Sequence, residues 1–252
     1  MTDDQINACA ALVERGDPDR FLAAMAAPVA ARGPLLVLAA FNLELARAPW
    51  VTREPLIARM RLQFWRDVVS GEGPAAHEVA APLRALIARA ALPADLLTAM
   101  IDAREAEIGT SAPFADTAAL LRFLDAGAGS LMALGVMALG GPRSEAALAL
   151  GAAQGMANYF LALPAIEAAG RRALPASASV YGLAQGALAR LDATRPGLRA
   201  LPRAARPALL AGWRARGLLT RALRDPDSVA RGALTQSEFA RRGSLLVRAI
   251  MG

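Results

Sequence analysis

The sequence lacks most of the residues that catalytic centres and metal sites use. All 28 of its basic residues are arginine, and it has one histidine, His77, and one cysteine, Cys9. These numbers exclude a disulfide framework and a Cys/His zinc cluster, and leave only His77 for a catalytic triad. The lone cysteine fits a reducing compartment. The sequence also has no phosphate-binding loop and no dinucleotide glycine fingerprint.

Acidic residues are scarce and scattered along the chain. Two carboxylates four residues apart share one helix face and can grip one metal cluster, but no Asp or Glu has an acidic residue four positions later. Pairs three residues apart are Glu14/Asp17, across a Gly-Asp-Pro break, and Asp102/Glu105, in an ordinary charged helix face. A Mg²⁺–diphosphate site needs oxygen ligands, so it would have to collect them from separate helices.

Aromatic residues make up only 5% of the chain, whereas hydrophobic residues make up 55%. Alanine and leucine supply most of the latter and favour helix. No strand-like alternation and no internal repeat occurs. The sequence therefore predicts an all-α protein, long enough for one large domain or two small ones.

Apolar spacing between proline and glycine breaks predicts the individual helices. A turn is expected at 195–198, and Thr235-Gln-Ser-Glu238 has the form of a capping box. The expected helices cover 3–15, 17–27, 34–47, 52–69, 78–91, 93–108, 117–140, 144–169, 179–191, 204–224 and 235–251.

Two long segments carry no charge, 126–142 and 146–166. The second is long enough to span a bilayer, and it contains Gly151 and Gly155 in a spacing common in packed membrane helices. A helix buried on all sides in a large bundle explains the same composition, and this is the interpretation we favour. A transmembrane hairpin is the alternative.

Charge is unevenly distributed. Residues 1–198 carry 17 arginines and 19 acids, whereas residues 199–252 carry 11 arginines and three acids. This basic quarter suits an anionic membrane surface or a solvated helix face. Nucleic acid is not expected, because no aromatic or zinc pattern accompanies the arginines. The N-terminus has no signal-peptide pattern, so we expect a cytoplasmic protein, peripheral at the inner membrane if it binds membranes.

The segment from Gln154 to Pro175 resembles the second signature of the squalene/phytoene synthase family. In that family an asparagine, which corresponds to Asn158 here, is followed by aspartates four and eight residues later. These aspartates hold Mg²⁺ against a prenyl diphosphate. Here those two positions are Ala162 and Ile166. The retained frame consists of Gln154, Asn158, Gly170-Arg171 and Leu174-Pro175.

Other segments extend the resemblance over residues 17–175. Aligning the family's first aspartate signature on Phe41 places its aspartates at Ala46, Arg47 and Trp50, so both metal clusters are missing. The matching segments are Asp17–Phe21, Arg32, Ala40-Phe41, Gln63–Trp65 with Asp67, and Ala126–Ser130 with Leu139-Gly140.

A subgroup of the family fits better. Phe41–Ala46, with Asn42 and Glu44, and Arg59–Trp65 resemble the group that contains a mitochondrial complex I assembly factor with this fold. The resemblance implies an all-α, single-domain isoprenoid-synthase-like bundle over residues 1–252, around an apolar cavity. It also implies a non-catalytic protein without a cofactor, whose partner is a respiratory-complex subunit, an assembly protein, or an isoprenoid or lipid ligand.

Polar residues on apolar helices are the candidates for lining a ligand cavity. Hydrogen bonding to a neighbouring helix is the alternative role for Gln63, Gln154 and Asn158, and Arg171 would either bind an anion or cap its helix. The candidates are Asn42, Glu44, Gln63, Gln154, Asn158 and Arg171.

Two rival functions remain open. The first is an active prenyltransferase that holds Mg²⁺ through displaced acids, for which the candidates are Glu44, Asp102, Glu105 and Glu167. The second is a peripheral membrane protein that acts through residues 199–252. Bulky Trp50 and Ile166 filling the former metal site would favour a binding or scaffolding role over the enzyme.

Overall fold

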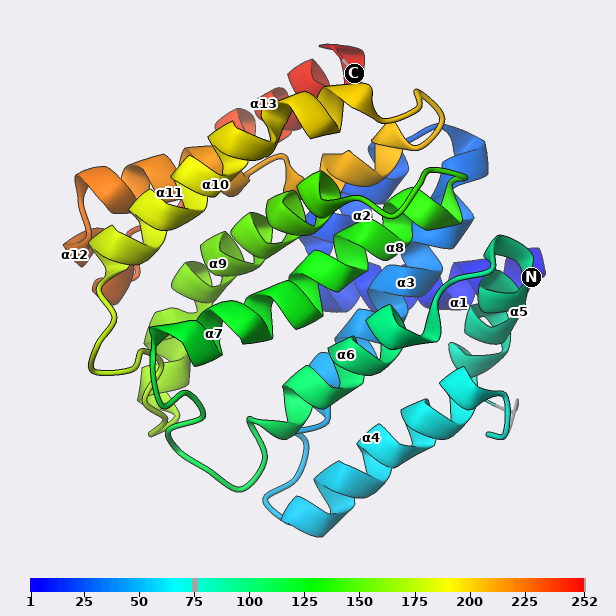
Figure 1. The fold of residues 1–252 in the computed structure, drawn as a ribbon, viewed down its shortest axis with the longest axis horizontal. Helices are drawn as coiled ribbons and strands as arrows, with labels where there is room; N and C mark the ends of the chain where they lie inside the picture. Colours follow the sequence, from blue (N-terminus) through cyan, green and yellow to red (C-terminus); the bar gives the residue numbers. More distant parts are fainter. Residues whose placement is uncertain (74–76, 252) are drawn as a thin grey trace.

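The computed structural model describes residues 1–73 and 77–251, and helices account for all the regular structure in these ranges (Figure 1). The first half contains α1 (Asp3–Gly16), α2 (Pro18–Ala26), α3 (Val29–Arg47), α4 (Pro55–Ser70), α5 (Ala80–Ala90) and α6 (Ala94–Glu105). The centre contains α7 (Thr117–Leu124), the π-helical turn η1 (Asp125–Gly129), α8 (Ser130–Ala138) and α9 (Glu145–Ala168). The last part contains α10 (Val180–Ala200), the 3₁₀ helix η2 (Arg206–Gly212), α11 (Ala215–Arg224), α12 (Asp227–Ala230) and α13 (Glu238–Met251).

Local sequence explains where several helices begin. Thr2 and Gln5 form a reciprocal capping box at the start of α1. Asp17 accepts a hydrogen bond from the backbone N–H of Arg20 at the start of α2, where Pro18 occupies the first turn. Ser144 caps α9 in the same way, through the N–H of Ala147.

Four sequence expectations are corrected by the structure. α3 begins at Val29, with Pro34 inside it, rather than at Pro34. α10 continues to Ala200 through the turn expected at 195–198, because Gly197 lets it pack closely on Ala146 of α9. The helix expected over 204–224 is divided into η2 and α11. α13 is capped by Ser237, which accepts from the N–H of Ala240, rather than by Thr235.

The core lies on both sides of α8 and α9, which run through the middle of the bundle (Figure 1). One group of buried side chains joins α1, α3, α4, α5 and α6, and a second joins α7, α9, α10 and α11. α4 and α13 lie on opposite sides of the molecule in this view. Packing on every face therefore explains the uncharged sequence of α8 and α9.

Close packing also explains the two glycines of α9. A Cβ on Gly155 would lie 2.6 Å from the Cβ of Ala128, and one on Gly151 would strike the Ala128 carbonyl oxygen. Three helical stretches are long and apolar enough to cross a membrane, Val29–Arg47, Thr117–Ala138 and Glu145–Ala168. Between 61% and 72% of each apolar window is buried inside the bundle, so packing against neighbouring helices accounts for their composition.

Candidate functional site

Arg171, which follows the second of the two degenerate signatures, contacts the segment where the first one ends. We call this region, residues 46–50 and 162–171, the α3/α9 end. The Arg171 guanidinium donates to the carbonyl oxygens of Pro49 at 3.2 Å and Glu107 at 3.3 Å. It also lies over the Trp50 ring, 4.0 Å from the ring centroid. Arg171 therefore ties the exits of α3, α6 and α9 together through carbonyl groups of other segments. Its expected roles were capping its own helix or binding an anion.

The side chains at the α3/α9 end cover it from outside. Trp50 is 43% exposed and lies beneath Arg171. Ala46, Arg47 and Ile166 are half-buried, and Ala162 is exposed. Trp50 and Ile166 thus do not fill a buried hole in the manner considered from the sequence. At the last position of the first aspartate signature, Trp50 instead makes a cation–π contact with Arg171.

The acids proposed as displaced metal ligands are mostly held by arginines. Glu44 pairs with Arg47 of the next helical turn at 3.3 Å. Asp102 and Glu105 share Arg66 of α4, at 2.7 and 3.0 Å. Each of these carboxylates therefore has a cationic partner rather than a second carboxylate beside it.

The donor set therefore does not fit the Mg²⁺ that the sequence signature implies. Glu167 is exposed near the end of α9, and Glu107 pairs with Arg104 at 3.0 Å. Within residues 1–73 and 77–251, no group of three or more His, Cys, Asp or Glu side chains lies close enough to hold a metal. Mg²⁺ requires carboxylate-type oxygen ligands in near-octahedral geometry, and this end of the bundle presents arginines and carbonyl groups in their place.

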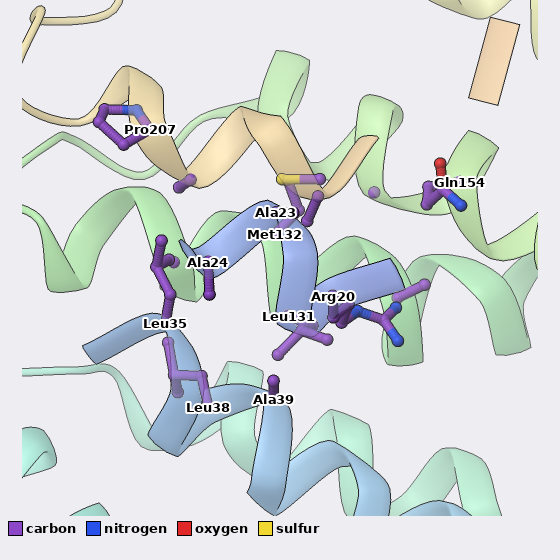
Figure 2. Close-up of a pocket in the computed structure, with 15 residues that line it drawn as sticks. Arg20, Ala23, Ala24, Leu35, Leu38, Ala39, Leu131, Met132, Gln154 and Pro207 are labelled. Atoms are coloured by element: carbon purple, nitrogen blue, oxygen red, sulfur yellow. The ribbon is translucent and has the colours of Figure 1, made fainter. Parts of the chain in front are cut away.

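A small apolar cavity lies at the centre of the bundle, between α2, α3, η1, α8, α9 and η2 (Figure 2). Its volume is about 40 Å³, whereas ligand pockets usually measure roughly 300–1,000 Å³ and one water needs about 10–15 Å³. The cavity therefore has room for a few waters and too little for a prenyl chain. Figure 2 shows Leu35 and Leu38 on one side of it, and Arg20 and Gln154 toward the other.

The polar residues of this cavity are Arg20 and Gln154. Arg20 pairs with Asp17 of the preceding turn. Gln154 donates to the Asn158 side-chain oxygen at 2.7 Å, while its own buried oxygen has no partner in the described part of the chain. The Gln154 oxygen is thus the polar group that a small ligand or a water in this cavity could satisfy.

Of the six candidate cavity residues, Gln154 alone lies on the central cavity in the described structure. Gln63 is exposed and donates to Asp67 one helical turn away, at 2.7 Å, and it does not line the central cavity. Asn42 is buried in α3, and Asn158 is half-buried beside Gln154. The hydrogen bonds of Gln63 and Gln154 stay within their own helices and do not bridge to neighbours.

Two features of the structure are not predictable from the sequence pattern. Arg20 was part of a matched motif, but nothing in its local pattern placed it against a cavity formed by six elements. A long groove lined by α10, η2 and α13 also went unnoticed, although leucine and arginine alternate at helical spacing between Leu191 and Arg199. Both follow from tertiary contacts between segments distant in sequence.

Comparison with known proteins places these observations in a family. The family model described as squalene/phytoene synthase matches residues 13–182. Curated relatives named "NADH dehydrogenase (ubiquinone) complex I, assembly factor 6" are 29% identical in Bos taurus and 28% identical in Homo sapiens, over 162 residues. These matches cover 62% of this chain and 48% of each relative, so the chain spans about half the length of the curated relatives it matches.

Solved structures share the fold at low sequence identity. A dehydrosqualene synthase in complex with ligand superposes with a TM-score of 0.76 at 14% identity, covering 98% of this chain and 95% of that one. The squalene synthase HpnC from Alicyclobacillus acidocaldarius superposes with a TM-score of 0.68 at 16% identity, covering 87% and 93%. The expected isoprenoid-synthase-like all-α fold is thereby confirmed.

Proposed function

The chain belongs to the squalene/phytoene synthase family, and from this premise we propose that it is a non-catalytic member that assists assembly of a complex I-type respiratory enzyme. Its similarity to the two curated complex I assembly factors supports the assembly role. We place it in the cytoplasm, peripheral at the inner membrane, where such a complex is built. Its partner in this proposal is a respiratory-complex subunit or another assembly protein.

One observation carries the non-catalytic part of the proposal. Where the family signature calls for aspartates, Arg171 lies over Trp50 and binds the Pro49 carbonyl oxygen. A diphosphate ester is ionised through Mg²⁺ ions that neutralise the leaving group, and such ions need several oxygen ligands. At the aspartate positions the α3/α9 end has Ala46, Arg47, Trp50, Ala162 and Ile166 instead, and the central cavity is too small for two prenyl chains.

The rival proposal, an active prenyltransferase with displaced ligands, has weaker support. Its candidate acids sit on α3, α6 and α9, and three of the four are bound to Arg47 or Arg66. Recruiting them would require breaking these ion pairs and enlarging the central cavity. No described contact brings Glu44 and Glu167 to a common point.

Deleting the gene in its own organism tests the assembly role. We expect lower NADH:quinone oxidoreductase activity in membranes and less fully assembled complex on native gels, both restored by the wild-type gene. A control measures squalene and carotenoid content, which should not change. Unaltered complex I together with loss of an isoprenoid product would contradict the proposal and favour the enzyme.

A matched pair of complementing alleles sharpens this test. Glu44→Ala and Glu167→Ala remove the acids on which the rival enzyme would depend, and the assembly proposal expects them to complement fully. If these alleles accumulate to normal levels but fail to restore the complex, the acids are needed and the proposal is wrong about catalysis.

A further inference from the structure

α13 is anchored to the bundle by one face. Leu245 is buried between α2 and η2, and the Arg241 guanidinium lies 2.8 Å from the Asp19 carboxylate of α2. Asp19 also pairs with Arg214, which precedes α11. This ion-pair cluster holds the helix against the protein and fixes which of its other faces points outward.

The outward face of α13 is a stripe of large apolar side chains. Phe239 is 90% exposed, Leu246 is 61% exposed and Ile250 is 75% exposed. Positions separated by four, seven and eleven residues share one side of a helix. Val247, 53% exposed, lies beside them. We call these four residues the α13 stripe. A contiguous apolar surface of this kind usually marks an interaction site.

A groove lies directly beside the stripe, between α10, η2 and α13. Its volume is about 890 Å³, and its apolar lining includes Leu198, Leu209 and Trp213. Val247 belongs to both the stripe and the groove, so the two surfaces are continuous. We call this feature the C-terminal groove.

Five arginines line the C-terminal groove, and no acidic residue does. Asp192 stands near it and is shared by Arg216 at 2.6 Å and Arg195 at 3.4 Å. The ion pair with Arg216 is the main reason that the pKa of Asp192 is lowered. The five arginines are Arg195, Arg199, Arg206, Arg216 and Arg248.

Three of these five arginines have no carboxylate partner among residues 1–73 and 77–251. Arg206 donates to the carbonyl oxygens of Leu201 and Arg199, at 3.0 and 2.8 Å, which fixes its guanidinium at the groove wall. Arg199 and Arg248 pair with no carboxylate among the described residues. The C-terminal groove thus has an apolar lining and five arginines, and Asp192 is the one carboxylate that pairs with any of them among the described residues.

We propose that the α13 stripe and the C-terminal groove dock the protein on an anionic phospholipid bilayer. The stripe enters the boundary between headgroups and acyl chains, as interfacial amphipathic helices do. The groove arginines face the lipid phosphates, to which cationic side chains near an anionic leaflet are attracted. Charge complementarity favours a lipid surface, because apolar side chains and arginines stand side by side on one continuous face. This inference does not depend on the assembly role.

Vesicle flotation tests the proposal with a matched control. The vesicles are phosphatidylcholine alone, or phosphatidylcholine with about one-third phosphatidylglycerol. The double variant Leu246→Ser/Ile250→Ser removes the stripe, while Leu56→Ser/Met60→Ser removes equally exposed apolar residues of α4 on the opposite side. We expect wild type and the α4 variant to float with anionic vesicles, and the α13 variant to lose at least tenfold in binding.

A second arm tests the arginines. Arg199→Gln/Arg248→Gln should also lower binding at least tenfold, while inorganic phosphate at millimolar concentration should not displace the wild-type protein. Circular dichroism melting of each variant confirms that the fold is kept, since all four substituted side chains of α13 and the groove are solvent-facing.

Several results would overturn the proposal. These are equal flotation with neutral and anionic vesicles, unchanged binding by the folded α13 variant, or an equal loss in the α4 variant. Conversion of a dimer to a monomer by the α13 substitutions, with vesicle binding intact, would instead assign the stripe to contact between two copies. Displacement by inorganic phosphate would assign the arginines to a soluble anion.

Discussion

Arginine has opposite roles at the two extremes of this molecule. At the α3/α9 end, Arg171 and Arg47 are bound by carbonyl oxygens and by Glu44. In the C-terminal groove, Arg199 and Arg248 reach solvent without a carboxylate partner among the described residues. A guanidinium whose donors are occupied joins segments of the fold, whereas one left open can attract an anionic partner.

The central cavity and the C-terminal groove differ in volume. The central cavity has a volume of about 40 Å³, and the C-terminal groove about 890 Å³. Packing of small residues around α9 explains the difference, because glycine and alanine let helices approach until little space remains. A third cavity, of about 420 Å³, lies between α7, α9 and α10, so the close packing is confined to the contacts of α9 with α2, α3 and α8.

The largest effect on stability is expected from a substitution that forces α9 away from the helices packed against Gly151. Gly151→Ala would place a Cβ against the Ala128 carbonyl oxygen and 2.6 Å from the Cβ of Met132. We expect a loss of about 3 kcal/mol in the free energy of unfolding, because backbone must shift to admit the methyl group. Urea denaturation followed by circular dichroism measures it.

Gly186→Ala in α10 is the matched control, because nothing lies within 4 Å of its added Cβ. This variant should gain up to about 1 kcal/mol, since alanine favours helix over glycine. Equal destabilisation by both substitutions would show that close approach at Gly151 does not hold the centre shut.

The next effect in size concerns Arg171. Arg171→Ala removes two hydrogen bonds to carbonyl oxygens and the contact with Trp50, so we expect a loss of about 2 kcal/mol in unfolding free energy. Arg171→Lys should recover less than half of it, since an ammonium cannot span both carbonyls. The groove residue Arg199 changed to Ala should leave stability within about 0.5 kcal/mol, and a larger loss there would remove the contrast.

Ionic strength should affect the C-terminal groove and the α3/α9 end differently, without any mutation. Raising sodium chloride from about 0.05 to 0.5 M should weaken anionic-vesicle binding at least tenfold, because exposed charges are screened over a few ångströms at high ionic strength. The urea midpoint should change little, since Arg171 acts through an aromatic ring and neutral carbonyl groups. Vesicle binding that persists at high salt would assign the affinity to the α13 stripe alone.

The smallest expected effect comes from replacing one missing acid. Ala162→Asp lies on an exposed position of α9 and should change unfolding free energy by less than about 0.5 kcal/mol. It should also give no Mg²⁺-dependent rise in melting temperature, because no group of three or more potential ligands lies close together among the described residues. A rise of several degrees with Mg²⁺ would mean that other oxygen ligands are already in place.

The sequence predicted the fold class, the family and most helix positions, because those depend on apolar periodicity and on proline and glycine breaks. It missed the continuation of α10 through Pro196-Gly197, where packing on Ala146 prevails over local turn preference. It placed Gln63 in a cavity, although that side chain is exposed on α4. Apolar spacing predicted a helix over 52–69 but not its buried face, since Leu56 and Met60 are exposed.

The site was less accessible from sequence. The sequence shows directly that Ala162 and Ile166 replace acidic residues. It does not show the ion pairs of Arg66 with Asp102 and Glu105, which join α4 to α6 across 36 or more residues. The contact of Arg171 with Trp50 joins residues even further apart. Such pairings depend on tertiary structure, which composition and spacing do not encode.

The measurement that tests the central claim most directly is pyrophosphate release from farnesyl and geranylgeranyl diphosphate by the purified chain with Mg²⁺. The account predicts no release above a protein-free control, because the α3/α9 end holds arginine and tryptophan where metal-binding carboxylates are required. Protein-dependent release that needs Mg²⁺, and that Glu44→Ala abolishes while the fold is kept, would contradict it.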